Sequence, residues 1–504
     1  MSKLAIVYSR AQNGIDAPLV RVEVHLSRGL PGLSIVGMAE TAVKESKDRV
    51  RAAIINTNLE FPKQRITINL SPADLPKEGG RFDLPIAVGI LAASKQVSAD
   101  RLTETEFIGE LSLSGELHPV SGVLPVAIQT AEATRVLVVP FENGAEAALI
   151  SSVTCKTARN LLEVCTWLNQ MDELPNAEKI NNVSTISVPD LSEVKGQLNA
   201  KRALEIAATG GHNLLFIGPP GTGKTMLATR MIGILPPLTE TQAIEAAAIA
   251  SISGKGFDIN NWHRPPFESP HHTASAVALV GGGSNPKPGD ISRAHYGLLF
   301  LDELPEFSRH VLEVLREPLE SGKVTISRAA RQAEFPARFQ LIAAMNPCPC
   351  GFLGDKERTC ICSQSQIERY RAKISGPLLD RIDMHVEVSR IAYKELRTIS
   401  DANETSNHVK ERVTIARNRQ LSRNNGKTNA HLDTKDMDNL LNISEKHLVM
   451  LENIVEKLKL SARAYHRILK ISRTIADLSN SEEVLREHLL EAISYRFLDR
   501  AVQI

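Results

Sequence analysis

Long apolar runs are absent from this chain of 504 residues. No stretch of about 18 consecutive apolar residues occurs, so we expect no membrane-spanning helix. The apolar run within residues 1–10 is too short for a secretory signal peptide. Cysteine is also scarce, since six cysteines in a chain of this length do not form the dense framework of a secreted disulfide protein. We therefore predict a cytoplasmic protein with no membrane partner.

Aromatic residues make up only 4% of the chain, and the formal net charge is only +1. The first value predicts aliphatic cores. The second excludes a global field that attracts nucleic acid or membranes, so any basic surface must be local. The remaining composition, 42% hydrophobic and 23% charged, is that of an ordinary globular protein. At roughly 150 residues per domain, the length suggests about three domains.

The clearest motif is a P-loop between a predicted strand at residues 212–217 and a predicted helix at residues 226–232. Its glycines allow tight turns that point backbone N–H groups at an anion. Lys224 supplies a positive charge for the β- and γ-phosphates of ATP, and the Thr225 hydroxyl is a ligand for Mg²⁺. A glycine-rich turn that matches by accident is the alternative, but both flanking elements of a phosphate-binding loop are present. The predicted nucleotide-binding residues are Gly218, Pro219, Pro220, Gly221, Thr222, Gly223, Lys224, Thr225 and Asp302.

A second motif, residues 297–303, is a hydrophobic strand that ends in two acids. Asp302 is predicted to hold Mg²⁺, directly or through water, and Glu303 to orient and polarise the attacking water. A buried strand with a solvated acidic end is the alternative, which the P-loop disfavours. The two motifs together predict ATP and Mg²⁺ as cofactors and ATP hydrolysis as the reaction.

Three further polar residues follow the two motifs. Asn346 lies at the tip of a predicted buried strand, residues 340–346. Arg381 lies within residues 377–383, and Arg463 lies at the start of a predicted helix. These pieces in this order resemble AAA+ ATPases, which have an α/β P-loop core and a helical lid.

This resemblance implies a role for each of the three residues. Asn346 corresponds to sensor 1, which helps to place the lytic water. Arg381 corresponds to an arginine finger, which reaches the γ-phosphate of a neighbouring subunit and stabilises charge in the transition state. A surface salt bridge with Asp380 or Asp383 is the alternative for Arg381. Arg463 resembles sensor 2, a phosphate contact, and Arg467 is the second choice.

Residues 1–168 form a separate predicted α/β domain without a P-loop. Strands are predicted at residues 20–26, 65–70 and 136–140, and helices at residues 41–58 and 83–93. Residues 75–84 and 109–122 resemble Lon-protease-type domains, in which a serine and a lysine form the catalytic dyad. Those two positions hold Arg81 and Pro125 here. Because a serine nucleophile needs a hydroxyl and a nearby base, the resemblance implies a catalytically dead relative, used for assembly or for guiding a substrate. A Lon-like protease is therefore the least favoured function.

The stretch between the P-loop and Asp302 is long and contains polar segments at residues 270–275 and 281–290. His271 and His272 lie in the first, where paired histidines are more typical of structural or interface groups than of ligands. This helix-2 insertion resembles the magnesium-chelatase and MCM-helicase branch of AAA+ proteins. The whole chain resembles the magnesium-chelatase-like ComM/YifB family. That resemblance implies a homohexameric, ATP-driven DNA helicase that promotes branch migration and integration of single-stranded DNA during natural transformation. The alternative is an ATPase that remodels a protein partner, as the magnesium-chelatase motor subunit does.

Local basic surface is predicted on two loops. Residues 321–338 have the pattern of a hairpin inserted before the sensor 1 strand, and their basic residues include Lys323, Arg328 and Arg331. Lys287 lies on the second loop. Clustered Lys and Arg in a ring pore bind phosphates without reading sequence, so we predict contact with single-stranded and branched DNA. A charged hairpin that only pairs subunits is the alternative.

Four of the six cysteines lie within residues 348–362. They form two C-x-C pairs, Cys348 with Cys350 and Cys360 with Cys362. Four thiolates can hold Zn²⁺ tetrahedrally as a structural clip. One residue between ligands is fewer than the usual two to four, so free thiols and a redox disulfide remain alternatives.

The other segments complete the predicted organisation. Residues 169–187 are a polar linker, residues 188–390 are the ATPase core, and residues 391–504 are an all-helical lid. Asp190 or Ser192 is a candidate cap for the first helix of the core.

Lid helices are predicted at residues 408–423, 445–458, 461–478 and 481–495. The first is basic, and we interpret its charges as a solvated face. In the last, Val484, Leu485 and Leu489 form an apolar stripe that is predicted to lie in the core.

Overall fold

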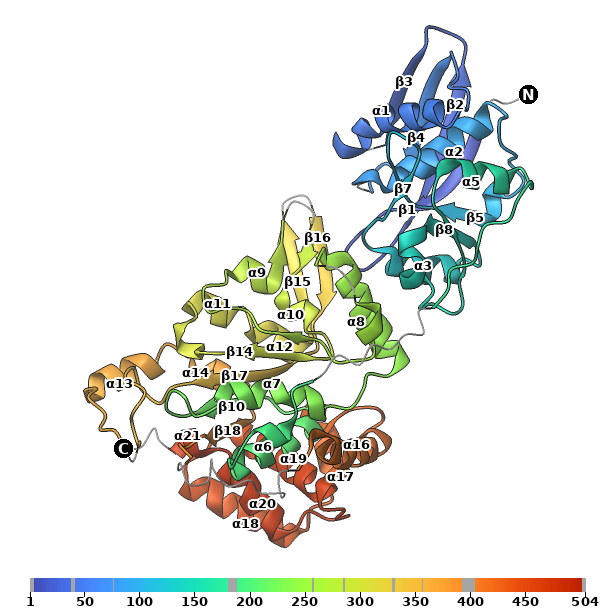
Figure 1. The fold of residues 1–504 in the computed structure, drawn as a ribbon. Helices are drawn as coiled ribbons and strands as arrows, with labels where there is room; N and C mark the ends of the chain where they lie inside the picture. Colours follow the sequence, from blue (N-terminus) through green and yellow to red (C-terminus); the bar gives the residue numbers. More distant parts are fainter. Residues whose placement is uncertain are drawn as a thin grey trace. The chain divides into compact units, whose positions relative to one another are not determined.

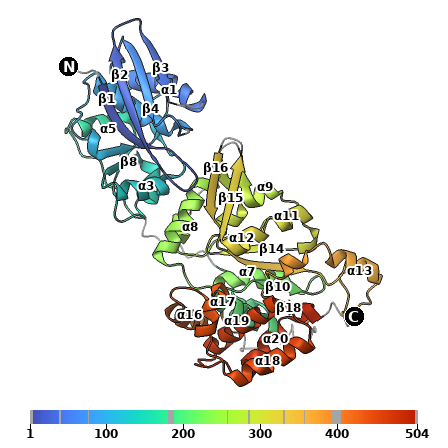
Figure 2. The same cartoon turned by 180° about the vertical axis from the view of Figure 1, so that it is seen from behind.

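A computed structural model describes residues 4–37, 41–75, 77–179, 188–255, 258–283, 286–328, 331–355, 357–391 and 404–500. The chain forms two compact units (Figure 1, Figure 2). Unit 1 contains Met1–Ser184, Ile244–Trp262 and Ser327–Phe335, and unit 2 contains Thr185–Ala243, His263–Ile326 and Pro336–Ile504. Residues 180–187 of the predicted linker and 392–403 of the predicted lid lie outside the described residues. Among the residues described, no helix has both the length and the apolar character that crossing a membrane requires.

Unit 1 is built on a seven-stranded mixed sheet with the order β3-β4-β2-β1-β5-β8-β9. β2 pairs antiparallel with β1 and β4, whereas β5, β8 and β9 continue the sheet in parallel. Along β2, Val20, Val22 and Val24 are buried and the residues between them are more exposed, so sequence alternation sets the face that packs on α2. The strands are β1 Leu4–Arg10, β2 Leu19–Ser27, β3 Gly32–Val36, β4 Arg65–Ser71, β5 Thr105–Phe107, β6 Glu110–Leu111, β7 Leu117–His118, β8 Val136–Pro140 and β9 Thr154–Ala158. The helices are α1 Thr41–Asn56, α2 Asp83–Ala93, α3 Val123–Glu132, α4 Gly144–Ala147 and α5 Leu161–Leu168.

These bounds confirm, to within two residues at each end, the strands and helices predicted for this region. Part of the predicted linker also has a defined place, beside β9. The Thr157 N–H donates to the Pro175 carbonyl at 2.9 Å, and the Ala177 N–H donates to the Cys155 carbonyl at 2.9 Å. The predicted domain boundaries stay predictions.

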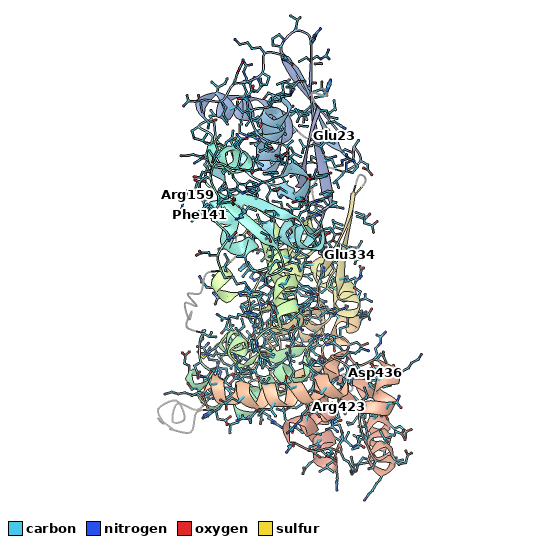
Figure 3. All side chains as sticks on the ribbon, turned by 90° about the vertical axis from the view of Figure 1, so that its right-hand side faces the viewer. Glu23, Phe141, Arg159, Glu334, Arg423 and Asp436 are labelled. Carbon is cyan, nitrogen blue, oxygen red and sulfur yellow. The ribbon has the colours of Figure 1, made fainter. Side chains whose placement is uncertain are left out.

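Charged residues contribute to unit 1 in two ways. The Glu106 carboxylate is fully buried and accepts hydrogen bonds from Arg10 at 2.6 and 2.9 Å, from Thr130 at 2.7 Å and from Arg135 at 3.1 Å. This pairing compensates for the loss of water around a buried carboxylate. On the surface, the Arg159 guanidinium lies 3.7 Å from the centre of the Phe141 ring, a cation–π contact (Figure 3).

Unit 2 is built on a five-stranded parallel sheet with the order β11-β14-β17-β10-β18. Every residue of β10, β14 and β17 is buried, as expected for parallel strands covered on both faces. The predicted strands before the P-loop, before the two acids and before Asn346 are confirmed as β10, β14 and β17. The sheet strands are β10 Leu214–Ile217, β11 Phe267–Glu268, β14 Leu298–Leu301, β17 Gln340–Met345 and β18 Met384–Glu387.

Helices and two short hairpins surround this sheet. The predicted hairpin at residues 321–338 is confirmed as the pair β15–β16. The hairpin strands are β12 Gly281–Gly282, β13 Lys287–Pro288, β15 Lys323–Arg328 and β16 Arg331–Pro336. The helices are α6 Leu198–Gly210, α7 Lys224–Ile234, α8 Glu240–Ser253, α9 Ala276–Val280, α10 Asp290–Arg293, α11 Arg309–Glu313, α12 Arg316–Ser321, α13 Gln364–Arg371 and α14 Gly376–Leu379. Asp190 caps the short turn Leu191–Glu193 by accepting a hydrogen bond from the Ser192 N–H. Of the two predicted caps, Asp190 is therefore the one that the structure uses.

The C-terminal part of unit 2 is helical, and α16 and α19 pack on α6. Its helices are α16 Ser406–Arg423, α17 Thr434–Leu440, α18 Glu445–Lys457, α19 Ala462–Leu478, α20 Arg486–Ser494 and α21 Phe497–Arg500. The interpretation of α16 as a solvated basic face is wrong for its four arginines, of which Arg419 donates to the Asp477 carbonyl at 3.1 Å. Arg412 pairs with Glu205 at 2.7 Å, Arg417 donates to the Thr209 carbonyl at 3.2 Å, and Arg423, labelled in Figure 3, pairs with Asp477 at 2.6 Å. The basic residues therefore hold α16 against α6 of the core and against α19.

The helix predicted at residues 481–495 is shorter in the structure and begins at Arg486. The residues before it make other hydrogen bonds, because the Arg473 guanidinium donates to the carbonyls of Ser481 at 2.6 Å and Glu482 at 2.7 Å. Val484 and Leu489 are buried as predicted. Leu485 is wrong as a core residue, since it sits at the N-cap and is 39% exposed.

Candidate active site

The P-loop connects the end of β10 to the start of α7. Gly221 and Gly223 have φ values of 77° and 89°, and a Cβ atom at either position would meet open space. These residues form the left-handed turns that the sequence predicted. Gly218 is needed for a different reason, since its backbone does not adopt the left-handed turn of the other two glycines. A Cβ atom there would lie 2.1 Å from the Val388 carbonyl oxygen, so glycine is needed for close packing beside β18.

Lys224, the first residue of α7, has its ammonium inside the loop. Its Nζ donates to the carbonyls of Gly218 at 2.7 Å and Pro219 at 2.9 Å, and to Asn346 Oδ1 at 3.1 Å. Burial lowers the pKa of Lys224, and the nearby Asp302 and Glu303 carboxylates act in the opposite direction. The amine is thus desolvated and aimed at the position that a phosphate takes in a P-loop.

The two acids follow β14 at the same edge of the sheet. β14 and β10 both pair in parallel with β17, so their carboxyl ends meet there. The Thr225 hydroxyl donates to Asp302 Oδ2 at 2.5 Å, which brings together the two predicted Mg²⁺ ligands. The hydroxyl and carboxylate oxygens are of the type that Mg²⁺ prefers, so these residues fit the ion.

These groups line one cavity of about 410 Å³. Its lining residues are Pro220, Gly221, Thr222, Gly223, Lys224, Thr225, Met226, Asp302, Glu303, Met345 and Asn346. The structure therefore places the P-loop, the two acids and Asn346 around a single space that is open to solvent.

Glu303 has a partner that the sequence did not predict. Its backbone has a φ of 52°, and its half-exposed carboxylate lies with Oε2 3.2 Å from Nδ1 of His272. The His272 ring in turn lies against the ring of His271, with centroids 4.1 Å apart. The sequence favours a structural or interface role for both histidines, whereas the structure places His272 against the predicted catalytic carboxylate.

The three predicted arginines lie outside the cavity lining. Arg381 donates to the Pro377 carbonyl at 2.6 Å and forms a salt bridge with Glu320. The alternative prediction of a salt bridge is therefore correct in kind but wrong in naming Asp380 or Asp383 as the partner. Arg463 pairs with Asp380 at 3.2 Å and is 64% exposed, and Arg467 pairs with Asp383. Their roles stay predictions.

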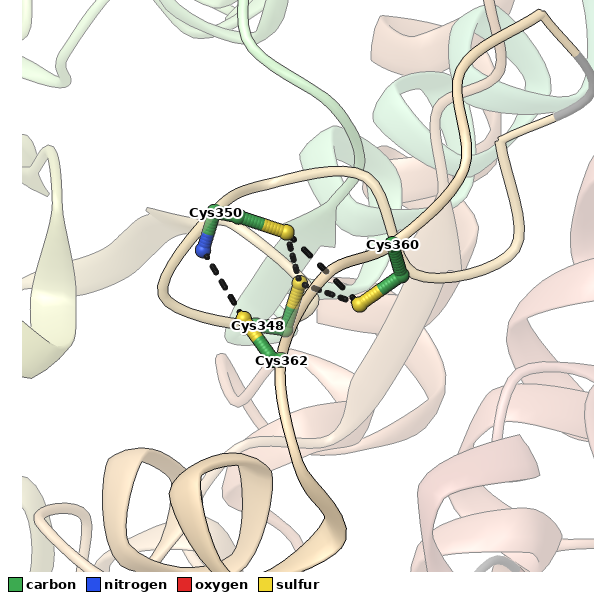
Figure 4. Close-up of side chains that lie close together, drawn as sticks. All are labelled: Cys348, Cys350, Cys360 and Cys362. Atoms are coloured by element: carbon green, nitrogen blue, oxygen red, sulfur yellow. Dashed lines mark hydrogen bonds between the residues drawn. The ribbon is translucent and has the colours of Figure 1, made fainter.

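The four cysteines of residues 348–362 converge on one point (Figure 4). The Sγ atom of Cys348 lies 3.4 Å from that of Cys350 and 3.7 Å from that of Cys360, and the last two are 3.6 Å apart. All four Sγ atoms lie within 4.8 Å of one another. Zn–S bonds of about 2.3 Å place tetrahedral sulfurs about 3.8 Å apart, whereas a disulfide requires about 2.05 Å. All six cysteines are free thiols, and the spacing of these four fits a metal site better than a disulfide.

Comparison with known proteins covers nearly the whole chain. The family described as "Magnesium chelatase, subunit ChlI" matches residues 190–396, "Subunit ChlI of Mg-chelatase" matches residues 22–143, and "Magnesium chelatase, subunit ChlI C-terminal" matches residues 403–496. The chain is 51% identical to Competence protein ComM of Haemophilus influenzae over 506 residues, which covers 99% of each chain. It is 49% identical to the uncharacterized protein YifB of Escherichia coli over 498 residues, which covers 99% of this chain and 98% of YifB. The chain belongs to the ComM/YifB family.

Members of the ComM/YifB family thus share magnesium-chelatase ChlI-like AAA+ domains with this chain. Magnesium-chelatase subunit ChlI of Pyropia yezoensis is more distant, at 26% identity over 155 residues, which cover 28% of this chain and 38% of that protein. Membership of an AAA+ family establishes this chain as an ATPase-type protein with ATP and Mg²⁺ as implied cofactors.

The ChlI-type domain of this ComM/YifB chain has no nucleophile at the predicted dyad positions. Arg81 is buried, and its Nη2 donates to Gln12 Oε1 at 3.0 Å and to the Ser121 carbonyl at 2.7 Å. Burial lowers the pKa of Arg81 to about 10. Pro125 lies buried in α3. A guanidinium and a proline ring supply neither the hydroxyl nor the base that a serine protease needs.

The candidate DNA-contacting residues lie on the two hairpins. Lys287 and Lys323 are exposed, and the side chains of Arg328 and Arg331 lie outside the described part of the chain. The hairpins are neighbours, because a Cβ atom at Gly281 would lie 2.8 Å from Ile326 Cδ1. Lys287 and Lys323 therefore belong to adjoining hairpins.

Proposed function

We propose that this chain is a homohexameric, ATP-hydrolysing DNA motor, a helicase that promotes branch migration and integration of single-stranded DNA during natural transformation. The observation that carries the proposal is the meeting of Lys224, Thr225, Asp302 and Glu303 in one cavity. The 51% identity to Competence protein ComM supports the biological context.

Hydrolysis would use the residues as follows. Lys224 exchanges its Gly218 and Pro219 carbonyl partners for the β- and γ-phosphates. Thr225 and Asp302 hold Mg²⁺, which neutralises phosphate charge when bound. Glu303 leaves His272 and polarises the attacking water, and Asn346 helps to place that water.

By resemblance to AAA+ rings, we propose that Arg381 reaches the γ-phosphate of the neighbouring subunit. Its single-chain partners, Glu320 and the Pro377 carbonyl, keep it outside the cavity of its own chain. A finger of this kind requires an oligomer, which is the reason to propose a hexamer. Arg463 is exposed, and among the bonds described it pairs with Asp380; it is the proposed sensor 2.

Lys287, Lys323, Arg328 and Arg331 are the proposed phosphate contacts. They belong to two adjoining hairpins, and a hairpin before the sensor 1 strand can transmit a change at Asn346 to DNA. Binding through phosphates is independent of sequence and weakens with salt. The alternative function, remodelling of a protein partner, is favoured by the matches to magnesium-chelatase subunit families.

Two further assignments accompany the motor. The Lon-like ChlI-type domain is catalytically dead and serves assembly or substrate guidance, because Arg81 and Pro125 occupy the dyad positions. The four thiols of residues 348–362 hold a structural Zn²⁺, since their spacing approaches that of a tetrahedral site.

Displacement of a labelled strand from a three-stranded junction tests the proposal. We expect ATP-dependent displacement by the wild-type protein and none by Glu303→Gln. A Lys287→Ala, Lys323→Ala variant should bind DNA less tightly and lose part of its salt dependence, with hydrolysis in the absence of DNA unchanged. Wild-type protein that hydrolyses ATP yet displaces no strand at any ATP concentration would favour the protein-remodelling alternative.

A further inference from the structure

The cysteine segment lies between two parts of the proposed catalytic machinery. β17 ends at Met345, Asn346 follows, and Cys348 comes two residues later and is fully buried. At the other end, Cys362 directly precedes Ser363, the N-cap of α13. In the described part of residues 346–362, no helix or strand holds the backbone in place. Its order must therefore come from cross-links and local contacts.

The cysteine segment touches the P-loop. A Cβ atom at Gly351 would lie 2.7 Å from Pro220 Cδ and 3.9 Å from Asn346 Cγ. The backbone between the two C-x-C pairs therefore packs directly against the phosphate-binding loop and the sensor 1 residue. The Gly351 N–H also donates to the Cys348 carbonyl at 3.0 Å, which fixes this contact to the first cysteine.

The helix that follows the cysteine segment, α13, also holds the start of that segment. The Arg371 guanidinium, at the end of α13, donates to the Pro347 carbonyl at 3.4 Å. Pro347 lies between Asn346 and Cys348, and the Asn346 side chain accepts a hydrogen bond from Lys224 at 3.1 Å. The Cys350 N–H donates to Cys362 Sγ at 3.4 Å, a bond of the kind that orients metal-bound thiolates. A continuous path of contacts thus runs from the sulfur cluster to the nucleotide cavity.

We infer that the four cysteines, loaded with a divalent metal of the zinc class, are a positioning device for ATP hydrolysis, which holds Asn346 and the Pro220 arm of the P-loop in their working places. This inference rests on the proposed ATP hydrolysis and adds to it a dependence on the metal. Loss of the metal frees the segment that supports Asn346 and Pro220, while the turns at Gly221 and Gly223 and the Thr225–Asp302 pair stay. Nucleotide binding therefore persists and turnover falls.

Metal content and kinetics of Cys360→Ser and Cys362→Ser give the first test. We expect about one zinc per wild-type chain and a loss of it in both variants, with kcat lowered about 10-fold and the Kd for a fluorescent ATP analogue changed less than about 2-fold. Circular dichroism and the oligomeric state, measured alongside, identify a variant that has failed to fold. A wild-type chain that takes up no zinc, or a metal-free folded variant with wild-type kcat, overturns the inference.

A glycine pair tests the contact without touching the thiols. Gly351 and Gly354 have nearly equal φ values of 84° and 81°, but only Gly351 faces Pro220, and a Cβ atom at Gly354 would meet nothing within 4 Å. Gly351→Ala and Gly354→Ala therefore introduce similar backbone strain, and both keep the metal ligands. We expect Gly351→Ala to lower kcat about 10-fold with zinc retained, and Gly354→Ala to stay close to wild type. Equal effects of the two substitutions overturn the proposed coupling.

Wild-type hydrolysis and its loss in Lys224→Ala separate the two proposals. A wild-type protein without Lys224-dependent hydrolysis removes the proposed function, and this inference falls with it. Lys224-dependent hydrolysis that is indifferent to zinc and to Gly351→Ala removes the inference alone.

Discussion

The pairing of Glu303 with His272 predicts that the protein restrains its own ATPase activity. The Glu303 carboxylate lies 3.2 Å from His272 Nδ1, and a carboxylate oxygen in contact with an imidazole nitrogen is less available to accept a proton from water. We therefore expect His272→Ala to raise hydrolysis in the absence of DNA. The loop that carries His272 continues directly into α9 and the hairpin with Lys287, so DNA bound at this proposed contact would have a route to release the pair.

The exposure of the pair sets the size of this effect. The side chains are 32% and 54% exposed, so solvent screens the interaction and its worth is about 0.2–1 kcal/mol. If only the unpaired carboxylate is active, removing His272 multiplies the rate by 1 + K, where K is the equilibrium constant for pairing. This gives an increase of about 2- to 6-fold.

Steady-state ATPase assays without DNA measure the increase. His271→Ala is the matched control, because His271 stacks on His272 and its described hydrogen bonds go to Thr273. The double variant His272→Ala, Glu303→Gln should be inactive, which ties any gain to Glu303. An unchanged or lower rate in His272→Ala would refute the reasoning and make His272 a residue that orients the carboxylate productively.

Three other predictions concern the stability of the fold and the binding of Mg²⁺. Glu106→Ala leaves Arg10 buried without its carboxylate and should lower the free energy of unfolding by about 3–5 kcal/mol in urea titrations, and a loss below about 1 kcal/mol would contradict this. Burial lowers the pKa of His212 to about 3, so between that value and about 6.5 the unfolded chain binds more protons at this group, and stability falls as the pH falls. The stability difference between wild type and His212→Gln should therefore shrink by up to about 1.4 kcal/mol per pH unit below pH 6.5, and a constant difference would exclude a buried neutral imidazole. Thr225→Ala removes the hydroxyl that meets Asp302 at 2.5 Å, so hydrolysis should need more Mg²⁺ for half-maximal rate, and an unaltered Mg²⁺ titration would remove Thr225 as a ligand.

Local sequence patterns predicted much of the cavity. The P-loop and the two acids each follow a short, wholly apolar strand, and parallel pairing brings the ends of such strands to one edge. The prediction therefore needed no information on long-range packing. Gly218 shows the limit, since its close approach to the Val388 carbonyl depends on a strand that lies far along the chain.

The features that the sequence did not predict depend on non-local partners. His272 reaches Glu303 because β11, only two residues long, pairs in parallel with β14, and so short a strand gives no periodic signal. The charges of Arg412 and Arg417 gave the pattern of a solvated face, but their partners, Glu205 and the Thr209 carbonyl, lie on another helix. The helix α20 begins later than the sequence predicts because Arg473, on α19, binds the carbonyls that a helix from residue 481 would use.

The most direct test of the DNA motor is steady-state ATP hydrolysis with and without single-stranded and forked DNA, beside Lys224→Ala and Glu303→Gln. The account predicts strong stimulation by DNA that is abolished in both variants and weakens as salt is raised. Robust hydrolysis by the wild-type protein that is indifferent to every DNA tested would contradict the account and point to a protein partner.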